Sequence, residues 1–187
     1  MKKLGLFLSL LCSFAGFSQV IVINELDSDT PSIDNLEFVE LKTQTPYFSL
    51  NGYVFVCFNG NPNSGSNTAL KSYYTMSLDG LTSDANGLVL IGSNDVSPAP
   101  ARTFGDNLLQ NGADAVAIYL GTFEDFPDGT LATTTNLIHA LAYDTSDPDA
   151  VELMALLNLT EQYNENENGQ QTTESIQRKN DGTYETK

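Results

Sequence analysis

The stretch VIVINELDSDTPSIDNLEFVELK, residues 20–42, decides the fold of this 187-residue chain. Two short runs of β-branched and other apolar residues, Val20–Ile23 and Phe38–Leu41, flank a loop rich in Asp, Ser and Pro. Valine and isoleucine favour strands, whereas Asp, Ser and Pro favour turns. The stretch therefore predicts two strands joined by a polar loop.

Turn signals divide the rest of the chain into similar short runs. Asn-Gly or Asp-Gly occurs eight times, and both dipeptides tolerate the positive φ of tight turns. Many short strands separated in this way predict an all-β, immunoglobulin-like β-sandwich. The expected strands are 20–26, 37–42, 53–58, 71–77, 88–92, 115–120, 137–143, and 175–178 pairing with 183–186. Residues 53–58 lack polar alternation, so both faces of this strand should be covered.

Two segments break the strand pattern. Residues 149–159 (DAVELMALLNL) carry apolar side chains at helical spacing after Asp147-Pro148-Asp149, which predicts one short helix capping an open end of the sandwich. Residues 161–173 (EQYNENENGQQTT) are almost wholly polar and predict an exposed loop.

The beginning of the chain predicts export. Lys2 and Lys3 precede an apolar run over residues 4–17, and Gly16-Phe17-Ser18 supplies small residues for cleavage. This pattern is typical of a secretory signal peptide, here residues 1–18, followed by one domain over residues 19–187. We therefore expect a secreted, extracellular or cell-surface protein. No later stretch is apolar enough for a membrane span.

The charge of the chain excludes one class of partner. The formal net charge is −16, and removal of residues 1–18, with two lysines and no acid, makes it −18. Binding to nucleic acid needs a basic patch that releases counterions from phosphates, and the sequence contains none. We expect no direct nucleic-acid binding. A protein or a surface polysaccharide is the expected partner. Four tyrosines in the expected strands could stack on sugar rings, or they could simply pack against neighbouring side chains: Tyr73, Tyr74, Tyr119 and Tyr143.

The residues available for catalysis are few. Cys57 lies inside an apolar run and should be a buried, inert thiol. His139, the sole histidine, lies in an alternating strand pattern, which favours a side chain at a sheet surface over a catalytic triad or a zinc ligand. We therefore expect no enzymatic activity.

Two strand glutamates stand out as polar residues on apolar strands. In an ideal strand Glu25 shares a face with Ile21 and Ile23, and Glu40 shares one with Phe38. The pair could act as general acid and base, hold a cation, or make structural hydrogen bonds, and structural bonding is the favoured interpretation.

Loop acids could bind calcium, whose preferred ligands are oxygens. One candidate set is Asp27, Asp29 and Asp34, and the other is Asp144, Asp147 and Asp149. Neither set has the spacing of a known calcium loop, so solvated loops are the competing interpretation.

Five segments, taken together and in order, resemble the lamin-tail domain family, in particular its exported bacterial members. They are residues 22–25 (VINE), 37–41 (EFVEL), 49–54 (SLNGYV), 110–119 (QNGADAVAIY), and the closing pair 175–178 (SIQR) with 181–184 (DGTY). The resemblance implies an immunoglobulin-like sandwich and a non-catalytic module for binding or attachment. His139 departs from it, since an acid is expected there.

The resemblance implies two functions. The first is a secreted domain that mediates attachment to a surface, partner or substrate. The alternative is an N-terminal accessory domain of a longer secreted nuclease or other hydrolase. The family has no catalytic residues to transfer to this sequence.

Overall fold

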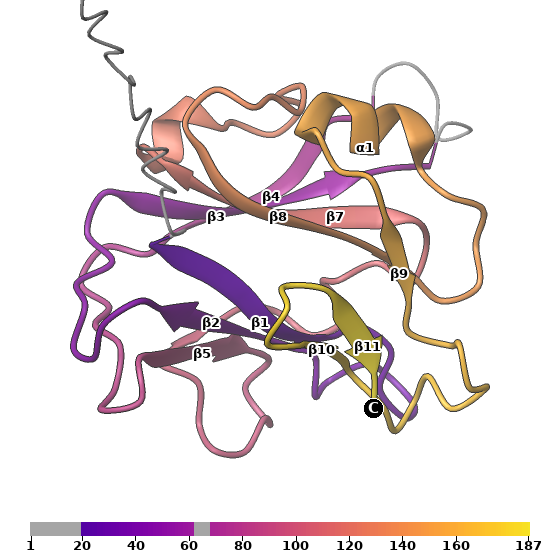
Figure 1. The fold of residues 1–187 in the computed structure, drawn as a ribbon, viewed down its shortest axis with the longest axis horizontal. Coiled ribbons are helices and arrows are strands. Elements are labelled where there is room, and N and C mark those ends of the chain that lie inside the picture. Colours follow the sequence, from indigo (N-terminus) through magenta and orange to yellow (C-terminus); the bar gives the residue numbers. More distant parts are fainter. Residues whose placement is uncertain (1–19, 62–67) are drawn as a thin grey trace, which may run out of the picture.

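The computed structural model describes residues 20–61 and 68–187. The eleven strands in these residues form two sheets that face each other (Figure 1). The predicted signal peptide lies outside the described residues. The six-stranded sheet contains, in spatial order, β11 (Tyr184–Thr186), β10 (Ile176–Arg178), β1 (Ile21–Asp27), β2 (Phe38–Thr43), β5 (Leu88–Gly92) and β6 (Arg102–Thr103). The five-stranded sheet contains β4 (Ser72–Ser77), β3 (Tyr53–Asn59), β7 (Asp114–Leu120), β8 (Leu137–Asp144) and β9 (Gln162–Asn164).

This architecture confirms the predicted all-β sandwich with a single short α-helix. Each predicted strand is present within one or two residues of its expected ends, because β-branched and aromatic runs bounded by turn residues specify strands locally. Strands β6 and β9 are additional and only two and three residues long. Both pair parallel with their neighbours, whereas all other pairs are antiparallel.

The main core lies between the two sheets. Alternate residues of β3 and β7 contribute to it, among them Phe55, Cys57 and Ile118, and they meet Leu26 and Val39 from the other sheet. Strand β3 lies between β4 and β7, and Val54 to Phe58 have no exposed surface. The predicted central strand with a buried Cys57 is therefore confirmed.

A second apolar cluster covers the outer face of the five-stranded sheet. Helix α1 (Val151–Leu157) packs there through Leu153, Met154 and Leu157, above this sheet in Figure 1. Alanines of β7 and β8 belong to the same cluster. The prediction of a helix is confirmed, but its predicted place at an open end of the sandwich is wrong, because the sheet has a second apolar face to bury.

Two further local predictions are wrong. Residues 161–173 are not simply an exposed loop, because Gln162–Asn164 form β9 and Glu165 is completely buried. His139 is only 8% exposed, and its Nδ1 accepts a hydrogen bond from the backbone N–H of Ile23 at 3.3 Å. It therefore lies at the junction of the two sheets rather than at a sheet surface. In residues 20–61 and 68–187, no helix is long and apolar enough to cross a membrane.

Candidate functional site

A groove of about 490 Å³ lies on the outer face of the six-stranded sheet, over β2 and β5. Phe38, Leu88 and Leu90 give it an apolar floor, and the loop of residues 96–101 forms one wall. Three carboxylates also border it: Glu25, Glu40 and Asp84. We call this feature the β2–β5 groove.

The floor follows from strand alternation. Val39 and Leu41 of β2 point into the core, so Phe38 and Glu40 point outward. Glu40 is paired with Leu90 of β5, and Lys42 with Leu88. An acid thus lies among apolar side chains on a face that is only partly exposed to solvent.

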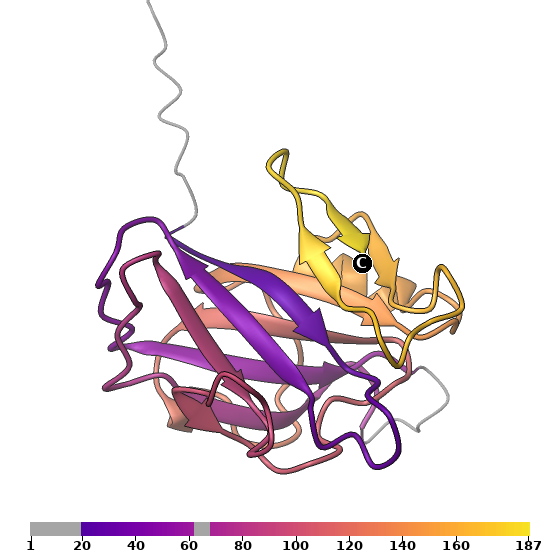
Figure 2. The ribbon, with the colours of Figure 1, turned by 90° about the horizontal axis from the view of Figure 1, so that it is seen from below.

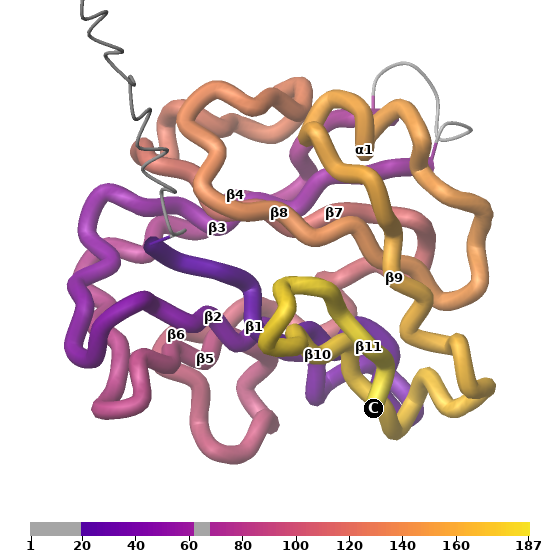
Figure 3. The backbone as a smooth tube through the Cα atoms, viewed as in Figure 1, coloured from indigo at the N-terminus to yellow at the C-terminus, as the bar shows by residue number. Residues whose placement is uncertain are grey.

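The wall is a loop that leaves β5 and returns beside it, as the tube in Figure 3 shows. The N–H of Ala101 bonds to the carbonyl of Leu90 at 2.8 Å, and β6 then pairs parallel with β5. Arg102 donates to the carbonyl of Asp79 at 2.8 Å and also to that of Ser77. These bonds hold the C-terminal end of the wall against the sheet.

Glu25 reaches this outer face because β1 is irregular. The register with β2 shifts between Ile23 and Glu25, which turns Glu25 away from the face of Ile23 and leaves Leu26 in the core. The predicted common face of Glu25 with Ile21 and Ile23 is therefore wrong. The bulge instead brings Glu25 directly opposite Glu40.

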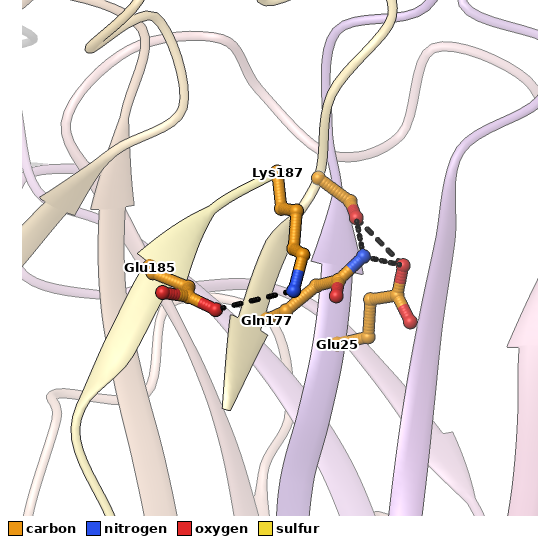
Figure 4. A network of polar contacts seen from close by, with 5 residues as sticks. Glu25, Gln177, Glu185 and Lys187 are labelled. Carbon is orange, nitrogen blue, oxygen red and sulfur yellow. Dashed lines mark hydrogen bonds and ion pairs between the residues drawn. The ribbon is translucent and has the colours of Figure 1, made fainter. Parts of the chain in front are cut away.

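Both glutamates make the structural hydrogen bonds expected of them. Oε1 of Glu25 accepts from the Ser175 hydroxyl at 2.6 Å and from the Gln177 amide at 3.1 Å (Figure 4). Oε1 of Glu40 accepts from the Asn24 amide at 2.7 Å. All three donors are neutral side chains, so these contacts orient the two carboxylates without neutralising them.

The electrostatics of the pair favour a positive charge. Burial raises the pKa of Glu40 and the neighbouring Glu25 raises it further, against the opposing effects of Asn24 and Lys42. In the described part of the chain the one ion pair is Glu185–Lys187, at 3.6 Å, and it includes neither Glu25 nor Glu40 (Figure 4). A cation entering the groove would therefore relieve repulsion between two carboxylates.

A second group of acids, buried at the loop end of β1 and β2, is not evident in the sequence. Asp27 and Glu37 have pKa values raised to about 8, and Glu165 has one raised to about 9, chiefly by burial. Glu165 accepts from the N–H of Ser28 at 3.1 Å, and Glu37 accepts from the N–H of Leu108 at 2.7 Å. The raised pKa values favour the protonated forms of all three at neutral pH, and Glu37 and Glu165 act as structural hydrogen-bonding groups.

The first predicted calcium set does not converge on one point. Asp29 is 7% exposed and bonds to Gln171, and Oδ1 of Asp34 accepts from the N–H of Thr30 at 2.9 Å. Asp27 carries a raised pKa. Over residues 20–61 and 68–187, no three His, Cys, Asp or Glu side chains are close enough to hold a metal ion.

The second predicted calcium set is divided between burial and solvent. Asp144 is buried, and its oxygens accept from the N–H groups of Ser146 and Asp147 at 2.7 and 3.1 Å and from the Gln162 amide at 2.7 Å. Asp147 and Asp149 are exposed. Asp144 shapes the turn that leads to α1, and no metal-binding cluster forms around it among the described residues.

The residues considered for catalysis and sugar stacking have structural roles. Cys57 is fully buried, which raises its pKa well above the usual value, and His139 is already an acceptor for a backbone N–H. Tyr119 and Tyr143 are completely buried, and Tyr74 packs edge-on against Phe104. These residues do not converge on an open site, so the β2–β5 groove is the best candidate for a functional surface.

Comparisons with models of protein families, with curated proteins and with solved structures give no match for this chain.

Proposed function

We propose that this chain is a secreted, non-catalytic binding or attachment module, similar to lamin-tail domains, whose β2–β5 groove holds a positively charged partner. The observation that carries the proposal is the placement of Glu25 opposite Glu40 beside an apolar floor. A ligand with an aliphatic stem and a cationic end matches that combination.

A protein surface bearing lysine or arginine fits the groove better than the other partners considered. The aliphatic stem of the lysine or arginine side chain can cover Phe38 and Leu90, while its charged end lies between the carboxylates of Glu25 and Glu40. A neutral polysaccharide would leave both charges uncompensated, and phosphates would be repelled by a chain of net charge −16. The same groove would serve the alternative role, accessory domain of a longer secreted hydrolase, because that role also requires capture of a partner.

The proposal can be tested with a single capped lysine, Nα-acetyl-lysine N-methylamide, and its uncharged analogue, the capped norleucine. Titration of the ¹⁵N-labelled protein with the lysine compound should shift the backbone signals of Glu25, Glu40 and Leu90. The norleucine compound should produce clearly smaller shifts, because it has the stem without the charge. Equal shifts from both compounds, or shifts outside the groove, would contradict the proposal.

A further inference from the structure

A second hollow, of about 610 Å³, runs along one edge of the five-stranded sheet. Six consecutive residues of β8, Leu137 to Ala142, line it. Side chains on one face of a strand belong to alternate residues, so a lining of consecutive residues means that the hollow follows the strand edge. We call it the β8-edge cleft.

The backbone of β8 lacks a neighbouring strand along most of this cleft. Strand β7 pairs with one side of β8. On the other side, within the described chain, β9 pairs with Ala142–Asp144 alone, and no strand pairs with residues 137–141. In an antiparallel ladder alternate residues direct their N–H and C=O groups away from the partner strand, so several such groups face the cleft.

The cleft has two walls. One wall is the segment of residues 158–161, which connects α1 to β9. Helix α1 ends at Asn158, whose backbone is in the left-handed conformation (φ 56°), and the chain first pairs with β8 at β9. The other is the turn of residues 181–183 between β10 and β11, a hairpin that projects beyond the sheets in Figure 2. A single strand can enter between the two walls and reach the edge of β8, whereas the walls would block the approach of a whole second sheet.

The nearby edge of β1 is already closed by side chains. The N–H of Ile23 bonds to His139, and the C=O of Ile23 accepts from the Tyr184 hydroxyl at 2.6 Å. Backbone groups available for a new partner in the cleft therefore belong to β8. Acids of both walls, Glu161 and Asp181, line the same space and are exposed, so a cationic peptide is favoured over an acidic one.

We propose that the β8-edge cleft binds an extended, basic peptide segment, which joins the five-stranded sheet as an additional strand beside residues 137–141. Main-chain hydrogen bonds to β8 would supply most of the recognition, and lysine or arginine side chains would face Glu161 and Asp181. β9 shows that this edge accepts a parallel strand, since it pairs there for three residues. The proposal is independent of the β2–β5 groove.

The test uses the peptide Ac-Lys-Val-Lys-Val-Lys-NH₂ and two N-methylated twins of it. In the first twin the backbone nitrogens of the valines are methylated, and in the second twin those of the lysines are methylated. A paired strand points alternate N–H groups at its neighbour and the others at solvent, so methylation should matter in one twin only. We expect one twin to bind like the parent peptide and the other at least tenfold more weakly. Equal binding by both twins, or no binding of the parent peptide, would overturn the proposal.

Hydrogen exchange locates the bound peptide. Residues 137–141 should gain protection at saturating peptide, and the double variant Glu161→Gln and Asp181→Asn should bind at least threefold more weakly. The groove variant with Glu25→Gln and Glu40→Gln removes any binding of the peptide lysines in the β2–β5 groove, and in this variant the peptide should protect residues 137–141 as it does in the original protein, which separates this proposal from the proposed function. Protection confined to the β2–β5 groove would contradict the assignment, and so would sedimentation showing that a second copy of the chain already occupies the β8 edge.

Discussion

Glu25 of β1 and Glu40 of β2 lie directly opposite each other across an antiparallel pair, although like charges in that arrangement destabilise a sheet. Glutamine can keep the acceptor oxygen that Glu40 offers to Asn24, while it removes the charge. We expect Glu40→Gln to raise the free energy of unfolding by about 0.2–1 kcal/mol. Urea unfolding measures the change, with the exposed Glu124→Gln as control; a loss of stability would show that the pair strengthens the fold.

The buried acids predict stability that falls as the pH rises. Asp27, Glu37 and Glu165 have folded pKa values of about 8, 8 and 9, above the unfolded values of 3.8 and 4.5. The folded state therefore binds more protons between these limits, and the stability present below about pH 4 is lost progressively until about pH 9.

Glu165→Gln tests this pH dependence. The variant keeps an acceptor for Ser28 but cannot ionise, so its melting temperature should fall less between pH 6 and pH 9 than that of the original protein. Glu167→Gln, an exposed neighbour, serves as the control and should leave the slope unchanged. Identical slopes for Glu165→Gln and the original protein would mean that Glu165 is ionised in the fold.

His139 should titrate far below the usual range. Burial, with a smaller effect of Arg178, lowers its pKa to about 4, so the stability that depends on neutral His139 is present above pH 6.5 and is lost as the pH falls toward 4. Because it is the sole histidine, its imidazole signal in NMR reports this directly. His139→Phe should cost about 1–3 kcal/mol, since the N–H of Ile23 loses its acceptor. A pKa near 6.5 would contradict the burial of this ring.

Calcium should act on this protein only through screening of its negative charge. No three ligand side chains converge within residues 20–61 and 68–187, so millimolar calcium and magnesium at matched ionic strength should raise the melting temperature equally. A calcium-specific increase that disappears in Asp27→Asn, but not in Asp147→Asn, would instead place a site in the loop after β1.

The sequence predicts the strands of this protein better than it predicts the candidate site. Runs such as residues 53–58 encode a buried strand locally, because β-branched and aromatic residues lie between Asn-Gly turns. The position of Glu25 depends on a bulge, and simple alternation predicts the opposite face. Glu165 lies in a polar segment, and its burial depends on Ser28, which is 137 residues away. Such long-range contacts have no signature in a local pattern.

The affinity for capped lysine, measured as a ratio to that for capped norleucine, tests the central claim most directly. We expect the original protein to bind capped lysine more tightly than capped norleucine. The double variant Glu25→Gln and Glu40→Gln should lose most of that preference, while its affinity for capped norleucine stays unchanged. This result would assign the preference to the carboxylates of Glu25 and Glu40, which both line the β2–β5 groove. A preference of the same size in the double variant would contradict the account.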